Sequence, residues 1–314
     1  MTFNKPAILL SLILALTTST IFAKEVTKAG QSLQQAYLSH WFSYDSSEPI
    51  NLVLGDVVDD EFGGHAQVRF LSDDGQVVNG LLAFPKQNNS SPKLALLLHP
   101  MGLDHQFWWN EERTKVGQEL SSHLRNQGYV VISLDARLHG ERSREGFGPR
   151  ELIKRAHSNE PRLYIDTIIG SVRDYRIALN WAKDKYKPDQ TLVLGYSMGA
   201  QMSLLLASLE SNINSVVAIV PPYVASPTSP VAPRIHVDRI IKAKVLWLAA
   251  TQDQYSDRNQ TQETFDRIAS ADKSLQWFDS GHRLPPEFLN SVFSFLDSLN
   301  PGDSSDDLKN ARSH

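Results

Sequence analysis

The chain of 314 residues contains no cysteine. That absence excludes disulfide bonds, a thiolate nucleophile and any metal site built on cysteine sulfur. The sequence also has no run of basic residues with interleaved aromatic side chains, and its formal net charge is −4. Nothing in it therefore indicates a nucleic-acid partner. The apolar stretch at residues 7–16 is shorter than the roughly 20 residues that cross a bilayer as a helix.

The same N-terminal stretch is typical of a secretory signal peptide. Lys5 gives a short positive start, small polar residues follow the apolar run, and Ala23 offers a cleavage position before Lys24. We therefore expect residues 1–23 to be a signal peptide that is cleaved after Ala23, with an uncleaved N-terminal anchor as the alternative. The protein is then expected to be secreted or periplasmic, with no stable membrane insertion after cleavage.

The rest of the chain has ordinary globular composition, with 41% hydrophobic and 21% charged residues, enough to build one large core. From residue 93 onward, continuous apolar runs alternate with helical patterns, which indicates a mostly parallel sheet with helices on both faces. Before it, two alternating strands are predicted at 66–70 and 77–84. We assign residues 24–60 to an N-terminal extension, 61–300 to the α/β domain and 301–314 to a disordered tail. The later strands are predicted at 94–98, 129–134, 191–194, 216–220, 245–250 and 275–278.

Two insertions interrupt this alternation. Residues 136–164 carry many charges, and residues 221–240 are rich in proline. Both follow predicted strands, and loops at the carboxyl ends of strands are where α/β folds place their sites. We expect these two segments to form walls of a substrate pocket with a small lid or none.

A tight strand-to-helix turn is predicted around Ser197. Strand-forming residues run into Gly195-Tyr-Ser-Met-Gly199, and a helical pattern follows at once. In this context Gly-x-Ser-x-Gly predicts a nucleophile elbow, because the turn leaves no room for side chains two residues before and after the serine. The helix that begins beneath the serine favours negative charge developing there.

A serine hydroxyl needs a base to take its proton and a third group to orient that base. His282 follows the last predicted strand next to Gly281, and Asp253 follows the strand at 245–250. Their order after Ser197 is the order that this kind of sheet uses. We assign His282 as the base and Asp253 as the orienting acid, with Asp257 as the alternative acid.

The tetrahedral intermediate of acyl transfer needs two N–H donors for its oxyanion. One is predicted to be the amide of Met198, directly after the serine. The second is expected from the loop after the strand at 94–98, where Pro100 has no N–H and Met101 is the first available donor. Aromatic and polar side chains near these points are candidates for the substrate pocket: His99, Phe107, Trp108, Tyr196 and Tyr223.

The stretch from Asp135 to Ser143 reads Asp-Ala-Arg-Leu-His-Gly-Glu-Arg-Ser. Together with the elbow and the order of the site residues, it resembles the α/β-hydrolase superfamily over residues 60–300, in the serine esterase and dienelactone-hydrolase-like branch. Leu138 stands where those relatives have glycine, and the cysteine nucleophile of dienelactone hydrolases proper is missing. The resemblance implies an α/β-hydrolase fold and hydrolysis of a small-molecule carboxylic ester through a serine acyl-enzyme.

Metal and cofactor chemistry is not predicted. His99, Asp104 and His105 lie close in sequence, but their spacing matches no zinc signature, and Ser197, Asp253 and His282 account for the chemistry without a metal. We expect an esterase acting on small or medium acyl compounds with no cofactor. The alternatives are an acyltransferase or peptidase on the same three residues, or a non-catalytic binding protein with this fold.

Overall fold

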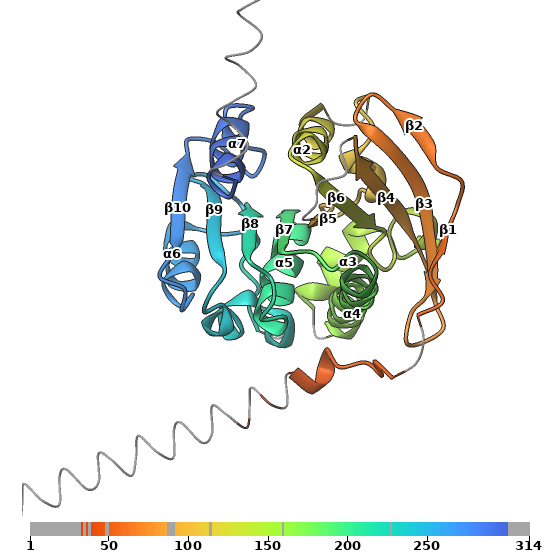
Figure 1. Cartoon of the computed structure of the whole chain (residues 1–314). Coiled ribbons are helices and arrows are strands. Elements are labelled where there is room, and N and C mark those ends of the chain that lie inside the picture. Colours follow the sequence, from red (N-terminus) through yellow and green to blue (C-terminus); the bar gives the residue numbers. More distant parts are fainter. Residues whose placement is uncertain are drawn as a thin grey trace, which may run out of the picture. The chain divides into compact units, whose positions relative to one another are not determined.

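The computed structural model describes residues 33, 36, 39–47, 50–86, 92–112, 115–158, 160–226 and 228–300. The chain divides into two units, Met1–Ser43 and Tyr44–His314. The account below concerns the second unit, which contains the sheet (Figure 1). The predicted signal peptide at 1–23 and the predicted tail at 301–314 lie outside the described residues.

Within the described residues, ten strands form one mixed sheet in the order β1-β3-β4-β6-β5-β7-β8-β9-β10, with β2 paired to β3. The pairs from β6 through β5 to β10 are parallel, and those among β1, β2, β3, β4 and β6 are antiparallel. The chain adds β6 on one side of β5 and then β7 on its other side, so the order of the strands reverses at β5. The loops that follow β5 and β6 therefore leave the sheet in opposite directions. The strands are β1 Val53–Leu54, β2 Val58–Asp60, β3 Gly63–Leu71, β4 Val77–Pro85, β5 Lys93–Leu98, β6 Tyr129–Leu134, β7 Gln190–Tyr196, β8 Ser215–Ile219, β9 Lys244–Ala250 and β10 Lys273–Phe278.

Residues 44–60 do not stand apart from the sheet. The short strands β1 and β2 both pair with β3, for example Val53 with Arg69 and Val58 with His65. We had assigned these residues to an N-terminal extension, because two- and three-residue strands are too short to show an alternating pattern. The sheet therefore begins earlier in the chain than the sequence analysis placed it.

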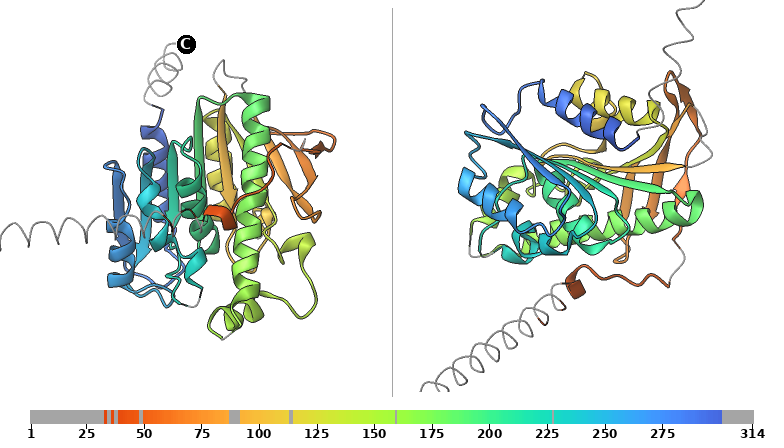
Figure 2. Two further views of the ribbon diagram at one scale, coloured as in Figure 1. Left: turned by 90° about the horizontal axis from the view of Figure 1, so that it is seen from below. Right: turned by 60° about the vertical axis from the view of Figure 1, so that its left-hand side comes forward.

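Helices cover both faces of the sheet. In Figure 2, α2 and α7 lie on one face, and α4, α5 and α6 lie on the other. The parallel strands between them are buried almost throughout, as their continuous apolar runs predict. The α-helices are α2 Lys115–Asn126, α3 Pro149–Ala156, α4 Arg162–Tyr186, α5 Met198–Leu209, α6 Arg258–Asp266 and α7 Phe288–Ser298.

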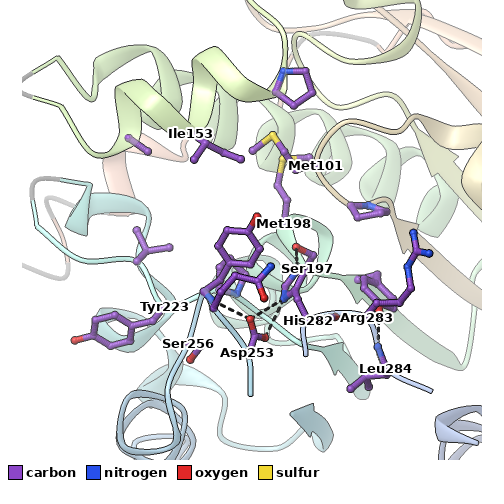
Figure 3. Close-up of a pocket in the computed structure, with 18 of the residues that line it drawn as sticks. Met101, Ile153, Ser197, Met198, Tyr223, Asp253, Ser256, His282, Arg283 and Leu284 are labelled. Carbon is purple, nitrogen blue, oxygen red and sulfur yellow. Dashed lines mark hydrogen bonds and ion pairs between the residues drawn. The ribbon is translucent and has the colours of Figure 1, made fainter. Parts of the chain in front are cut away.

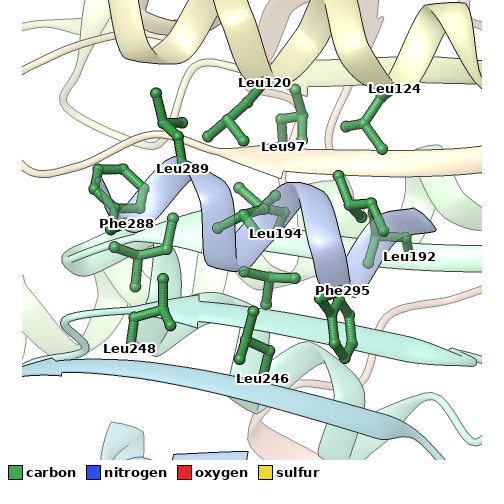
Figure 4. Close-up of a cluster of buried hydrophobic side chains, with 14 of the residues drawn as sticks. Leu97, Leu120, Leu124, Leu192, Leu194, Leu246, Leu248, Phe288, Leu289 and Phe295 are labelled. Atoms are coloured by element: carbon green, nitrogen blue, oxygen red, sulfur yellow. The ribbon is translucent and has the colours of Figure 1, made fainter. Parts of the chain in front are cut away.

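The core on the α2 and α7 side is built from leucine and phenylalanine (Figure 4). Side chains of α2 and α7 pack there against side chains of the strands. Among them are Leu120 and Leu124 of α2, Phe288 of α7, and the strand residues Leu97 and Leu194, all of them buried. Burying side chains of this kind contributes roughly 1.5–3 kcal/mol each. This layer fixes β5 and β7 against α2 and α7, and both strands end at the site described below.

The elbow helix α5 is buried nearly all round, because it lies between the sheet and α4. Helix α3 is a new element inside the 136–164 insertion. It has only eight residues, with Pro149 in its first turn and Leu152 as its one buried side chain. A pattern so short and so charged gives little helical periodicity to detect. In the described part of the chain, no helix is long and apolar enough to cross a membrane.

Candidate active site

Ser197 lies at the tight turn between β7 and α5. Its backbone has φ 55° and ψ −115°, a conformation that non-glycine residues rarely adopt. A Cβ on Gly195 would overlap the backbone of Gly199, and a Cβ on Gly199 would overlap the Leu98 carbonyl oxygen of β5. The Ser197 amide donates to the Ile219 carbonyl at 2.8 Å, which ties the turn to β8. The two glycines therefore let the turn sit close enough to the sheet to hold the serine in this conformation.

Three side chains from different loops form one hydrogen-bonded chain (Figure 3). His282 Nε2 lies 2.7 Å from Ser197 Oγ, and His282 Nδ1 lies 3.0 and 2.9 Å from the two oxygens of Asp253. The Asp253 carboxylate is 3% exposed and the imidazole 17% exposed, so the pair is largely shielded from water. Asp257, the alternative acid, caps the N-terminus of α6 by accepting from the Gln260 amide. Asp253 is therefore the carboxylate that can orient the imidazole.

Two tyrosines brace the loop that carries His282. The Tyr196 hydroxyl donates to the His282 carbonyl at 3.3 Å and accepts from the Leu284 amide at 3.2 Å. The Tyr255 ring stands edge-on to the imidazole, with centroids 4.6 Å apart. The Tyr255 amide also donates to Asp253 Oδ1 at 2.9 Å. Sequence reasoning did not identify Tyr255, although its position two residues after an acid is a common arrangement for such a turn.

Met101 and Met198 both line the cavity that contains Ser197. Met198 is the first residue of α5, where helical N–H groups have no intrahelical acceptor. Met101 follows Pro100 at the end of β5, which is the strand next to β7. Both residues predicted to donate to an oxyanion are thus beside the serine.

A cavity of about 1040 Å³ opens around these groups. This volume is at the upper end of the range for small-molecule sites. Phe107, Tyr196 and Tyr223 line it, as predicted. Both insertions also contribute walls. Helix α3 and the loop after β8 supply these lining residues: Pro149, Ile153, Ala156, His157, Pro222, Val224, Ala225, Ser226 and Thr228.

His99 and Trp108 do not line the cavity, which corrects their assignment to the pocket. Both are 0% exposed. His99 Nδ1 donates to the Pro100 carbonyl at 2.9 Å, and Nε2 accepts from the Ala136 amide at 2.9 Å. Burial lowers the pKa of His99 to about 4, helped by His139 beside it. The imidazole is therefore a neutral bridge between the ends of β5 and β6. Trp108 packs in the hydrophobic core.

The residues weighed as metal ligands have other partners. His105 Nδ1 donates to Asp135 Oδ1 at 2.7 Å inside the protein, and the Asp104 carboxylate accepts from the Gln106 amide. Among the described residues no group of three or more His, Asp or Glu side chains is arranged to hold a metal. Asp135 also accepts from the Glu141 amide at 3.0 Å, so it organises the loop that follows β6. Hydrogen bonds from His105 hold the pKa of Asp135 below its usual range despite burial.

In that loop Leu138 adopts φ 63°. This is the left-handed conformation that glycine favours. The backbone at Leu138 therefore has the left-handed conformation that a glycine would adopt, although the residue is leucine.

Three features together define the α/β-hydrolase class. They are a strand order with one reversal, a serine on a sharp strand–helix turn, and an acid and a histidine that follow later strands. The family model described as "alpha/beta hydrolase fold" matches residues 95–288. The match covers more than half of the chain, and the chain belongs to this family.

Solved structures show the same fold. A cold-adapted esterase from an Arctic intertidal metagenomic library is 19% identical, with 80% of this chain and 99% of that chain covered and a TM-score of 0.60. Acetyl xylan esterase 1 from Thermoanaerobacterium is 16% identical, with 84% and 93% covered and a TM-score of 0.65. An esterase from Pyrococcus furiosus is 18% identical, with 78% and 97% covered and a TM-score of 0.55. No curated protein matches the chain by sequence.

Proposed function

We propose that this protein is a serine hydrolase that cleaves carboxylic esters of small or medium acyl compounds. The observation that carries the proposal is the hydrogen-bonded chain in which His282 Nε2 lies 2.7 Å from Ser197 Oγ while Asp253 holds Nδ1. An imidazole held in this way can accept a hydroxyl proton, and binding alone does not require the arrangement. The esterase activity named for the structural relatives agrees with it.

In the proposed first half-reaction, Ser197 Oγ attacks the ester carbonyl carbon as His282 Nε2 takes its proton. The carbonyl oxygen becomes an oxyanion that accepts hydrogen bonds from the amides of Met198 and Met101. His282 then gives the proton to the alkoxide as the C–O bond breaks, and the alcohol leaves. The product is an acyl ester on Ser197.

In the second half-reaction, water replaces the alcohol and His282 acts as base again. The C–O bond to Ser197 breaks, the serine recovers its proton and the carboxylic acid leaves. Asp253 keeps Nδ1 protonated, so that Nε2 faces the serine, and its charge stabilises the imidazolium formed in each step. The N-terminus of α5 beneath Ser197 favours the negative charge on the oxyanion. We further propose that the protein acts outside the cytoplasm, after removal of residues 1–23.

Labelling with a fluorophosphonate tests this proposal on protein that begins at Lys24. We expect one adduct on Ser197 and hydrolysis of p-nitrophenyl acetate. Ser197→Ala should abolish both. His282→Ala should lower kcat by roughly 10³-fold or more, because the serine and the histidine act together and neither works without the other. Ser274→Ala on β10 and His123→Ala on α2 are matched controls that should keep full activity. Ester turnover that survives Ser197→Ala would overturn the proposal.

A further inference from the structure

One face of the short helix α3 forms part of the cavity wall. Pro149, Ile153 and Ala156 are spaced by four and three residues, which places them in one stripe, and all three line the cavity. Leu152 points into the protein and is fully buried. In Figure 3, Ile153 extends from α3 into the space beside Met101. An apolar stripe on an otherwise charged helix thus faces a hollow rather than the core.

The loop after β8 forms the opposite side of this hollow. Pro222, Tyr223, Val224 and Ala225 line it, and the Tyr223 amide is fixed to the Tyr255 carbonyl at 2.9 Å. Tyr164 of α4 also contributes, and its hydroxyl donates to Gln201 at 2.6 Å. Because that hydroxyl is already satisfied, Tyr164 offers mainly its ring to a ligand. The space between α3 and residues 222–225 is therefore walled mostly by hydrocarbon.

The chemistry at Ser197 decides which half of an ester enters this space. The leaving oxygen must lie within reach of His282 Nε2, and the oxyanion must face the amides of Met101 and Met198. The acyl substituent then points away from His282. In Figure 3, Ile153 and Met101 both lie on the far side of Met198 from His282, whereas Arg283 adjoins the imidazole. The hollow beside α3 is on the acyl side.

We propose that the space between α3 and residues 222–225 is an acyl-chain subsite that selects apolar chains longer than acetyl. This inference rests on the proposed function and names its substrate class. An acetyl group carries one methyl and would leave most of the hollow filled with water. Each methylene buried there should raise kcat/KM about fourfold.

The experiment compares kcat/KM for p-nitrophenyl acetate, butyrate and octanoate, which share one alcohol. Butyrate should exceed acetate by about 15-fold, since two more methylenes are buried. Ile153→Trp and Ala156→Trp fill the hollow and should lower the octanoate-to-acetate ratio by about tenfold or more. Lys154→Trp places the same side chain on the exposed face of α3 and should leave the ratio unchanged. Ile153→Asn, which adds polarity without bulk, should lower the ratio even if a tryptophan variant misfolds.

The outcomes separate the two proposals. The subsite is wrong if the wild type prefers acetate, or if the filled variants keep the octanoate ratio. It is also wrong if the variants lose turnover of long alkyl acetates instead, because the hollow would then hold the alcohol. If p-nitrophenyl acetate is not hydrolysed at all, or Ser197→Ala still hydrolyses it, the proposed function fails rather than the subsite.

Discussion

At the scale of single residues, Tyr196 shows how position and role can separate. Sequence analysis placed it in the substrate pocket, and its side chain does line the cavity. Its hydroxyl, however, bridges the His282 carbonyl and the Leu284 amide. The residue before Ser197 thus braces the loop that carries His282. Tyr196 acts through His282 and is a positioning residue.

Tyr196→Phe removes both hydrogen bonds and keeps the ring. We expect kcat to fall about 5- to 150-fold with little change in KM, because two bonds of roughly 0.5–1.5 kcal/mol each no longer hold His282 in place. The rate of fluorophosphonate labelling should fall by the same factor. Tyr129→Phe breaks a hydroxyl contact to Gln190 far from the cavity and serves as the control. Equal labelling rates in the two variants would contradict the positioning role.

At the scale of elements, α4 ends in an unusual way. Lys187 caps its C-terminus in the left-handed conformation, with φ 48° and ψ 55°, and its amide donates to the Lys183 carbonyl at 2.9 Å. Glycine is the usual residue at this point, because a Cβ is costly there. The side chain is exposed, so it gains little from packing.

Lys187→Gly should therefore stabilise the protein by about 1 kcal/mol, because the cost of a left-handed lysine disappears. The free energy of unfolding in urea measures this gain. Lys185→Gly makes the same change inside the last turn of α4 and should cost about 1 kcal/mol. A loss of stability in both variants would show that Lys187 is not strained.

How much of the fold the sequence predicts depends on how many residues each pattern spans. The long buried strands were predicted because their apolar runs extend over several residues. Ser197, Asp253 and His282 were predicted because each follows a recognisable strand. Helix α3 and strands β1 and β2 are too short to carry a period that the sequence could show. His99 and Trp108 were placed wrongly, because nearness to a site in sequence does not say which way a side chain points.

At the scale of the whole molecule, several histidines are buried in the neutral form. Burial lowers the pKa of His99 to about 4, and it also lowers the pKa values of His139 and His236. Protonating His99 would also break its bond from the Ala136 amide. In the unfolded chain these groups titrate near 6.5. The unfolded state therefore binds more protons than the folded state below that pH.

The contribution of these histidines to the free energy of unfolding should accordingly be fully present above pH 6.5. It should fall as the pH drops from 6.5 toward 4. His99 alone contributes a loss on the order of 3 kcal/mol across that interval. Urea unfolding at a series of pH values measures the slope. His236→Gln should flatten the curve, whereas His157→Gln, at an exposed position, should leave it unchanged. A stability that stays constant down to pH 4.5 would contradict the prediction.

The distance along the chain between Ser197 and His282 is 85 residues. His282 follows β10, the last strand, which takes its place only by pairing with β9. During synthesis the ribosome therefore releases the elbow serine long before the imidazole that would activate it. Under the mechanism proposed above, Ser197 in a half-made chain has no base beside it, and it gains one only when β10 pairs with β9.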